Sequence, residues 1–335
     1  MSTLTRRSLL GAALLTGMAA CAPTNRTSSG GQSPNPSGDL PQLTLGLTYV
    51  PDIQFAPVYV AHHFDWFAEE GVSVTPRHHG AQEKLLGALQ TGDEDVVFAG
   101  GGEMLQGRAE QIPVRNFGTV YQTYPCVIVV PADSPIQSLA DLRGHSVGLP
   151  GEYGENWFYL LAALQEAGLS RDDLDIASIG YTQLAALTGN RVDAVVGFVN
   201  NDVVRFEEAN FPIRTLTIDD PPLVGVGFGA LDPTIADRRD DLAAMLRGVK
   251  RGAELCTSDP EQAVQIAVEY VPTLAEAEQQ QHALAVLKAT TRLFGDEFGR
   301  QDPQRWAAMA TFFAAQGLVS QPVPATDAYT TDITA

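Results

Sequence analysis

The sequence has few cysteines and few positive charges, and each shortage excludes a class of protein. Only three of the 335 residues are cysteine, which excludes a small fold held together by many disulfides. Lysine and arginine number 21 against 40 acidic residues, giving a formal net charge of −19. Nucleic acids and anionic membrane surfaces both attract clustered cations. The composition therefore argues against a nucleic-acid partner and against electrostatic docking on a membrane.

Familiar catalytic motifs are also missing. The chain has no Gly-x-Ser-x-Gly elbow, no His-Glu-x-x-His motif and no Cys-x-x-Cys pair. The glycines at 100–102 lack the spacing of a dinucleotide loop and the lysine of a P-loop. Glu152 and Glu155 lie three residues apart on a turn, a spacing that does not define an acid–base pair. We therefore predict a protein that is not an enzyme, with no catalytic residues and no cofactor.

Long apolar runs are scarce, and the one near the N-terminus is short. Arg6 and Arg7 precede the apolar stretch 9–20, which is too short to span a bilayer and is typical of an export signal. The arginines resemble a twin-arginine motif, and the sequence MAAC resembles a bacterial lipobox that ends at Cys21. We expect residues 1–20 to be removed as the signal. The alternative is a plain signal peptide followed by an incidental cysteine.

The segment after this signal lacks the apolar residues that a core requires. Residues 21–41 are rich in serine, glycine, proline and asparagine, which predicts a flexible tether that begins at a lipidated Cys21. The mature protein is then exported and attached to the outer face of the bacterial cytoplasmic membrane by its lipid anchor alone. Outside the cytoplasm it has no ready access to ATP or nicotinamide cofactors.

Beyond residue 42, short β runs alternate with helical stretches, which indicates largely parallel α/β sheets. The predicted helices include 55–69, 82–91, 157–167 and 184–188, and the chain from 235 to 317 is almost wholly helical. The nine predicted strands are 43–48, 72–77, 96–99, 114–121, 127–130, 146–149, 176–179, 194–198 and 213–218.

This order of elements predicts an α/β fold with two doubly wound lobes and a helical C-terminal region. Residues 42–124 together with 223–320 form lobe 1, and residues 125–222 form lobe 2. Two crossing segments join the lobes. The first is near Tyr124 and Pro125, and the second is the Asp-Asp-Pro-Pro sequence at 219–222 followed by the glycine-rich GVGFGA.

Ligands of open α/β sheets bind where strands end and helices begin, and six loops of this chain occupy such positions. None of the six contains lysine or arginine, and five contain aromatic residues. An anionic ligand would normally be met by an arginine or lysine fork. Aromatic walls with carboxylates and amides suit a flat, neutral heterocycle. The loops are 49–55, 100–103, 121–125, 150–157, 180–183 and 198–202.

The candidate ligand-binding residues come from these loops and from the helix that follows the first of them. Aromatic rings would stack on the ligand, while Glu103, Asn156 and Asn200 would hold its ring heteroatoms by hydrogen bonds. For Phe55 and Trp157 the alternative is a place in the core. The full set is Tyr49, Asp52, Phe55, Tyr59, Gly101, Glu103, Tyr124, Tyr153, Asn156, Trp157, Tyr181, Phe198 and Asn200.

Two histidine pairs and two cysteines remain to be assigned. Adjacent side chains on a helix point about 100° apart, and adjacent side chains on a strand point to opposite faces. The histidine pair at 62–63 and the pair at 78–79 therefore cannot each direct both rings at one metal ion. We predict no metal site. Cys126 and Cys256 either pair or remain as buried free thiols.

Five stretches resemble, in order, the extracytoplasmic substrate-binding proteins of ABC importers. They are PDIQFAPVYVA, WFAEEGVSV, EMLQGRAEQIPV, SPIQSLADLRGHSVGLPG and AALTGNRVDAVVGFVNND. Within that class the chain resembles the group of thiamine-pyrimidine-precursor, riboflavin and sulfonate/nitrate binders. The resemblance implies a periplasmic-binding-protein type II-like fold that closes on a small ligand between its lobes. It also implies an ABC permease and a cytoplasmic ATPase as partners, and we expect a monomer.

The first loop departs from one branch of this group. Pyrimidine-precursor binders read Pro-Asn-x-x-His there, whereas this chain has Asp52 and Phe55 at the Asn and His positions. The stretches QFAPVYVA and RHHGAQE are more similar to the riboflavin branch. A fungal relative that makes the pyrimidine from its own histidine carries clustered cysteines, which this chain lacks.

The expected function is capture of a neutral heteroaromatic vitamin or precursor, either riboflavin or a thiamine-type aminopyrimidine. A sulfonate or nitrate binder remains an alternative within the same class. An exported enzyme on this fold and a structural envelope lipoprotein are the alternatives from other classes.

Overall fold

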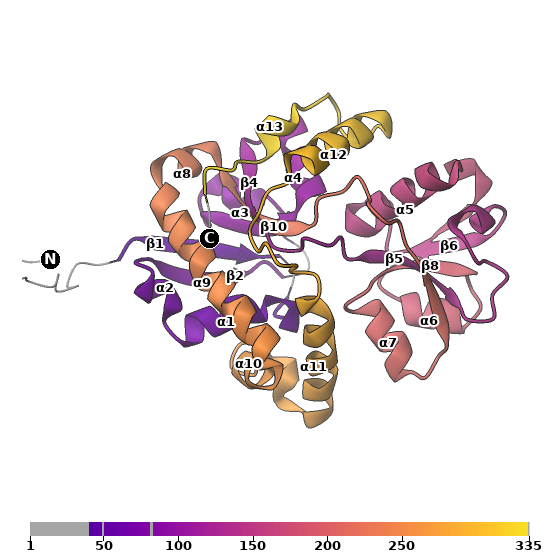
Figure 1. The fold of residues 1–335 in the computed structure, drawn as a ribbon, viewed down its shortest axis with the longest axis horizontal. Coiled ribbons are helices and arrows are strands. Elements are labelled where there is room, and N and C mark those ends of the chain that lie inside the picture. The colour runs from indigo at the N-terminus through magenta and orange to yellow at the C-terminus, as the bar shows by residue number, and fades with distance from the viewer. Residues whose placement is uncertain (1–39, 49, 81–82, 334) are drawn as a thin grey trace, which may run out of the picture. The chain divides into compact units, whose positions relative to one another are not determined.

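The computed structural model describes residues 40–335 except 49, 81, 82 and 334. The expected signal at 1–20, the lipidated Cys21, most of the tether and the candidate Tyr49 lie outside the described residues. Residues 40–335 form one compact unit. Within it, ten strands are arranged in two sheets of five (Figure 1).

The first sheet combines strands from two distant parts of the chain. β1 pairs in parallel with β2 and β3, while β10 pairs antiparallel with both β3 and β4. All five residues of β3 are buried, as expected of a central strand covered on both faces. In spatial order the strands are β2 (Ser73–His78), β1 (Gln42–Leu47), β3 (Val96–Gly100), β10 (Val226–Leu231) and β4 (Val114–Thr119).

The second sheet uses only the strands between β4 and β10. β6 pairs in parallel with β7 and β8, and β5 pairs antiparallel with β8 and β9. In spatial order they are β7 (Asp175–Ser178), β6 (Ser146–Leu149), β8 (Ala194–Phe198), β5 (Cys126–Pro131) and β9 (Ile213–Leu216). All nine predicted strands are thus present.

The tenth strand, β10, corrects the prediction that GVGFGA belongs to a crossing segment. Its glycines weaken the strand pattern in the sequence, but they are required by the packing. A Cβ atom on Gly227 would lie 2.4 Å from the Gly118 carbonyl oxygen, and one on Gly229 would lie 2.8 Å from Met104 Sδ. The glycines let β10 lie between β3 and β4 in the first sheet.

The helix predicted over 55–69 is divided in the structure. A 3-10 turn at Ile53–Phe55 leads into α1 (Ala56–His63), and α2 (Trp66–Glu69) follows as a separate turn of helix. Asp65 separates them because it adopts a left-handed conformation with φ 55°. The other helices of this part are α3 (Gly87–Thr91), α4 (Gly101–Ala109), α5 (Gly154–Ala167), α6 (Gln183–Thr188) and α7 (Asp202–Glu208).

The helical C-terminal region is confirmed and supplies much of the core. Its longest helix, α9, buries Leu242, Met245, Leu246 and Val249, a spacing that places one apolar face against the protein. Figure 1 shows α9 lying beside α1, with which it is in contact. The helices are α8 (Asp232–Asp237), α9 (Arg239–Ser258), α10 (Pro260–Ala267), α11 (Ala277–Thr291), α12 (Pro303–Ala315) and α13 (Ala325–Ala328).

The α/β class with two doubly wound sheets is confirmed. The lobe boundaries at 42–124 with 223–320 and at 125–222 stay predictions. Among the described helices, none combines the length and apolar character needed to cross a bilayer.

Candidate ligand-binding site

The carboxyl ends of β1 and β3 meet at one edge of the first sheet. The two strands are parallel neighbours, with Leu45 paired to Val96. After β1, the Asp52 carboxylate caps the 3-10 turn, because its Oδ1 accepts a hydrogen bond from the Gln54 backbone N–H at 3.0 Å. Burial raises the pKa of Asp52, although this hydrogen bond opposes the shift. The turn therefore presents a half-buried carboxyl group at the edge where ligands bind in such sheets.

Two tyrosines lie close to Asp52. Burial raises the pKa of Tyr59 and of Tyr121. A hydrogen bond from the Asp52 backbone opposes the shift at Tyr59, whereas the charge of Asp52 adds to the shift at both tyrosines. The Tyr59 hydroxyl lies 3.1 Å from His78 Nε2, and its ring stacks on Tyr270 with centroids 4.6 Å apart. The Tyr121 hydroxyl is buried, and no described residue forms a hydrogen bond with it. The Tyr121 hydroxyl is therefore a buried polar group near Asp52 whose hydrogen-bonding capacity is not used within the described chain.

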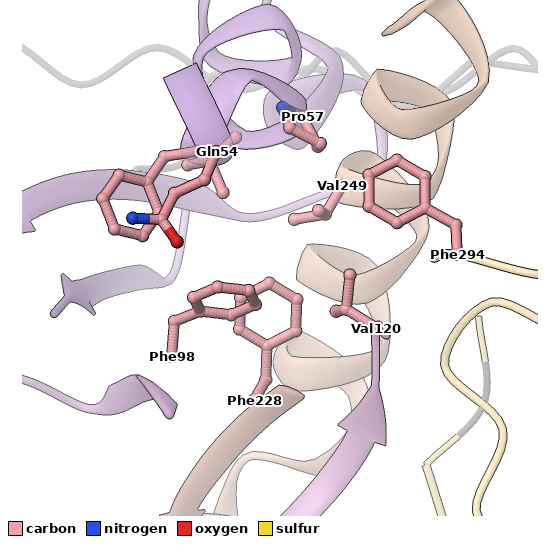
Figure 2. A pocket seen from close by; sticks show the side chains of 9 residues that line it. Gln54, Pro57, Phe98, Val120, Phe228, Val249 and Phe294 are labelled. Atoms are coloured by element: carbon pink, nitrogen blue, oxygen red, sulfur yellow. The ribbon is translucent and has the colours of Figure 1, made fainter. Parts of the chain in front are cut away.

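Next to this turn lies a small apolar pocket, which we call the phenylalanine pocket (Figure 2). Phe98 of β3 lies between Phe55 and Phe228, with ring centroids 5.9 and 5.1 Å away. The void is small, with a volume of ≈ 10 Å³. Its walls are Gln54, Phe55, Pro57, Val58, Phe98, Val120, Phe228, Val249 and Phe294.

Glu103 and Glu155 form a second polar feature, which we call the carboxyl pair. Glu103 begins α4 and accepts the Gly100 backbone N–H at 3.0 Å through Oε2. Glu155 begins α5, is 9% exposed, and neither carboxyl oxygen has a hydrogen-bond partner among the described residues. A Cβ atom built on Gly100 would lie 1.8 Å from Glu155 Oε1 and 3.3 Å from Glu103 Oε2. The two carboxyl groups therefore converge on one glycine.

This convergence changes the protonation of the carboxyl pair. Burial, followed by the charge of Glu103, raises the pKa of Glu155 to about 8, and burial raises the pKa of Glu103 as well. Both carboxyl groups therefore favour the protonated form more than an exposed glutamate does. The N-terminus of α4, which would otherwise attract an anion, already binds the protein's own carboxyl group.

Three candidates on the second-sheet side are buried among other protein groups. The Tyr124 hydroxyl donates to the Glu155 backbone oxygen at 3.1 Å. Asn156 Oδ1 accepts a weak hydrogen bond from the Cys126 thiol at 3.6 Å. The indole of Trp157 is 3% exposed and lies beneath the Arg171 guanidinium, 4.6 Å from the ring centroid. Tyr124 is therefore held by the Glu155 backbone beside the carboxyl pair, while Trp157 packs inside the protein.

The remaining candidates differ in exposure. Gly101 lies against Val224, whose Cβ would be 2.7 Å from an added Cβ atom. The buried Asn200 donates through Nδ2 to Thr290 Oγ1 at 2.9 Å, and its Oδ1 has no described partner. Phe198 is half-buried. Tyr153 and Tyr181 are 57% and 71% exposed, near the carboxyl ends of β6 and β7.

The structure brings Asp52, Phe55 and Tyr59 together with Phe98 and Tyr121, which were not among the candidates. Tyr121 lies in one of the six loops, but Phe98 lies inside a buried strand. Because all five residues of β3 are buried, the sequence pattern of this strand does not distinguish a ring that lines a pocket from a ring that fills the core.

The histidines and cysteines have separate partners or none. His62 lies 2.9 Å from the Tyr270 hydroxyl, and His79 lies 2.8 Å from a Glu94 carboxylate oxygen. Within residues 40–335 as described, no three potential metal ligands are grouped together. Cys126 and Cys256 are both buried and free, which decides between the two alternatives left open by the sequence.

A comparison with protein families identifies the family of this chain. The family model described as NMT1/THI5 like matches residues 52–263, from Asp52 through both sheets into α10. The chain belongs to the NMT1/THI5-like family. The resemblance suggested by the five sequence stretches is confirmed.

Relatives of this NMT1/THI5-like chain include binding proteins and an enzyme. The riboflavin-binding protein RibY of Chloroflexus aurantiacus is 30% identical over 95% of this chain and 94% of its own length. The formylaminopyrimidine-binding protein of Halalkalibacterium halodurans is 23% identical over 87% of this chain and 90% of its own length. The 4-amino-5-hydroxymethyl-2-methylpyrimidine phosphate synthase of Legionella pneumophila is 25% identical over 70% of this chain and 75% of its own length.

Solved structures identify the fold. The periplasmic aliphatic sulphonate binding protein SsuA from Escherichia coli superposes with a TM-score of 0.70 at 18% identity, covering 85% of this chain and 91% of that chain. The chain therefore has a periplasmic-binding-protein fold, as expected. At this identity the likeness concerns the fold alone.

Proposed function

We propose that this protein is the extracytoplasmic substrate-binding component of an ABC importer, and that it captures a neutral heteroaromatic vitamin or precursor. Riboflavin and a thiamine-type aminopyrimidine are the candidate ligands, because two relatives are named as binders of riboflavin and of formylaminopyrimidine. The single observation that carries the proposal is the composition of the site. Aromatic rings and carboxyl groups form it, and none of the six candidate loops contains lysine or arginine.

Each part of the site matches a part of such a ligand. The rings around Phe98 and Tyr121 offer apolar faces to a flat heterocycle. Asp52 is an acceptor for an N–H or O–H donor, such as an amino group or a hydroxyl. The expected mechanism is ligand-stabilised closure between the two sheets, which the transporter then recognises.

A sulfonate or nitrate binder is the alternative within the same class. An anion would need a cation or free N–H groups at a helix N-terminus. Glu103 already accepts the N–H at the start of α4, and Glu155 approaches the same glycine. The carboxyl pair thus favours a neutral ligand over an anion.

An enzyme on the same fold is the alternative from another class, because one relative is named a synthase. Cysteine chemistry would need an accessible thiolate. Burial raises the pKa of Cys126 and of Cys256, so both thiols stay protonated at neutral pH. Incubation with each ligand followed by mass spectrometry tests this alternative. Recovery of unchanged ligand supports a binding protein, and turnover would contradict it.

A ligand panel tests the proposal directly. The protein without residues 1–20 is unfolded, dialysed free of co-purifying ligand and refolded. Its melting temperature is then measured with riboflavin, formylaminopyrimidine, taurine and nitrate. We expect stabilisation by riboflavin or the pyrimidine only, since ligand binding to the folded state raises stability by mass action. Stabilisation by taurine or nitrate alone would refute the proposal.

Replacement of Asp52 tests whether its carboxylate accepts a hydrogen bond from the ligand. We expect Asp52→Asn to weaken ligand binding by about 1.5–3 kcal/mol, because a charged acceptor becomes a neutral amide. The measurement is titration calorimetry at pH 7. Asp133→Asn, which changes an exposed turn, is the matched control and should bind like the wild type. Equal affinity of the Asp52→Asn protein would remove Asp52 from the site.

Export and anchoring through Cys21 form part of the same proposal. In a bacterium that expresses the full chain, an alkyne-labelled fatty acid should modify the wild type. Cys21→Ser should lose the label and move from the membrane fraction to the soluble fraction. Labelled Cys21→Ser protein would contradict lipidation at this residue.

A further inference from the structure

The phenylalanine pocket is placed where a ligand at Asp52 would reach it. Gln54 is the residue that connects the two features, since its backbone N–H binds Asp52 and its side chain lines the pocket (Figure 2). The eight other lining residues are buried, so Gln54 is the lining residue that remains half-exposed. No hydrogen bond joins the Gln54 side-chain amide to the described residues. Gln54 is therefore the one polar, half-exposed side chain among the residues that line the void.

The walls of this pocket offer no polar partner apart from that amide. Phe98, Phe228 and Val249 are 6%, 1% and 1% exposed, and they come from two strands and from α9. A void of ≈ 10 Å³ has room for about one water-sized group. Because water would need two to four polar partners, an apolar group of similar size suits the void better.

We propose that the phenylalanine pocket is a methyl-group subsite, which receives the methyl-bearing edge of a flat aromatic ligand after Gln54 turns aside. This inference rests on the proposed function and narrows its ligand class to methyl-substituted rings. The polar substituents of the ring remain outside the pocket, within reach of Asp52. The aromatic edges around the void supply contacts on several sides of the methyl group.

The test compares two ligands and two substitutions by titration calorimetry. The ligands are riboflavin and the analogue that lacks both ring methyl groups. Val249→Ile adds one methyl group to the wall of the void from α9. Val286→Ile adds the same group to a buried site on α11 that does not line the pocket, and is the matched control. Thermal melts establish that each variant is folded.

We expect the wild type to bind riboflavin about tenfold more tightly than the analogue, the usual effect of one methyl group in an apolar pocket. Val249→Ile should weaken riboflavin binding about tenfold and leave the analogue within twofold. Val286→Ile should change neither. The wild-type comparison tests the subsite even if Val249→Ile fails to fold.

Other results overturn the inference in distinguishable ways. Equal wild-type affinity for riboflavin and the analogue, or an equal effect of Val249→Ile on both, would refute the subsite while leaving the proposed function intact. If neither flavin binds, the comparison is made with 4-amino-5-hydroxymethyl-2-methylpyrimidine and its analogue without the ring methyl group. Failure of all four compounds and of formylaminopyrimidine would refute the proposed function and the subsite together.

Discussion

At the scale of the residue, Glu155 shows how burial determines protonation. Its carboxyl oxygens lack described hydrogen-bond partners, and Glu103 lies beside them, so the charged form is costly. Burial also raises the pKa of Asp52, and it raises the pKa of Asp202 to about 6. An acid whose folded pKa is raised contributes stability that is lost as pH rises.

The sign of this effect gives a testable dependence on pH. The unfolded chain releases the Glu155 proton near its ordinary pKa of about 4.3, whereas the folded protein retains it up to about 8. The free energy of unfolding should therefore fall as pH rises from about 4.5 to about 8. Glu155→Gln should flatten this slope and stabilise the protein at pH 8 by on the order of 1–3 kcal/mol.

Urea unfolding between pH 4.5 and 9 measures this effect. Glu152→Gln, three residues away on an exposed turn, is the matched control and should keep the wild-type slope. An unchanged slope in the Glu155→Gln protein would show that the carboxyl pair does not hold the proton.

At the scale of the element, the sequence predicted what depends on local pattern. β3 and β8 were found because short runs of buried apolar residues alternate with helical stretches. β10 was missed because its glycines are explained only by distant neighbours. The Gly118 carbonyl and Met104 Sδ leave no room for a Cβ atom on this strand. The break at Asp65 was missed because a left-handed aspartate carries no strong local signal. Both the strand β10 and the helix break at Asp65 depend on contacts that the local sequence does not show.

The contact between α1 and α9 depends on one such glycine. A Cβ atom on Gly252 would lie 1.9 Å from the Pro57 carbonyl oxygen, so α9 would have to move away from α1. We expect Gly252→Ala to destabilise the protein by about 1–3 kcal/mol through overpacking, although alanine favours helices. Urea unfolding measures the loss.

The matched control for Gly252→Ala is Gly87→Ala in α3. An added Cβ atom there would meet only Lys84 Cβ, at an ordinary 3.5 Å. This variant should be neutral or slightly stabilised. If the two alanine variants have the same free energy of unfolding, α1 and α9 can move apart without loss of stability.

At the scale of the whole molecule, residues that follow β8 of the second sheet contact helix α11. Asn200 follows β8 and donates to Thr290 at 2.9 Å, while Glu208 of α7 lies 2.7 Å from His282. The sequence identified Asn200 as a polar group at a strand end, but its partner is 90 positions away and carries no local signal. These contacts connect the elements whose closure would accompany ligand binding.

Removal of the Thr290 hydroxyl tests whether these contacts support ligand affinity without touching the ligand. Thr290→Val keeps the side-chain shape but leaves Asn200 Nδ2 without its partner. If the binding-competent arrangement becomes less populated, the apparent dissociation constant rises in proportion. We expect calorimetry to show ligand binding weakened about three- to tenfold. The neighbouring Thr291→Val, whose hydroxyl bonds only within α11, should bind like the wild type. Equal affinities of the two valine variants would mean that Asn200 and Thr290 do not bias closure.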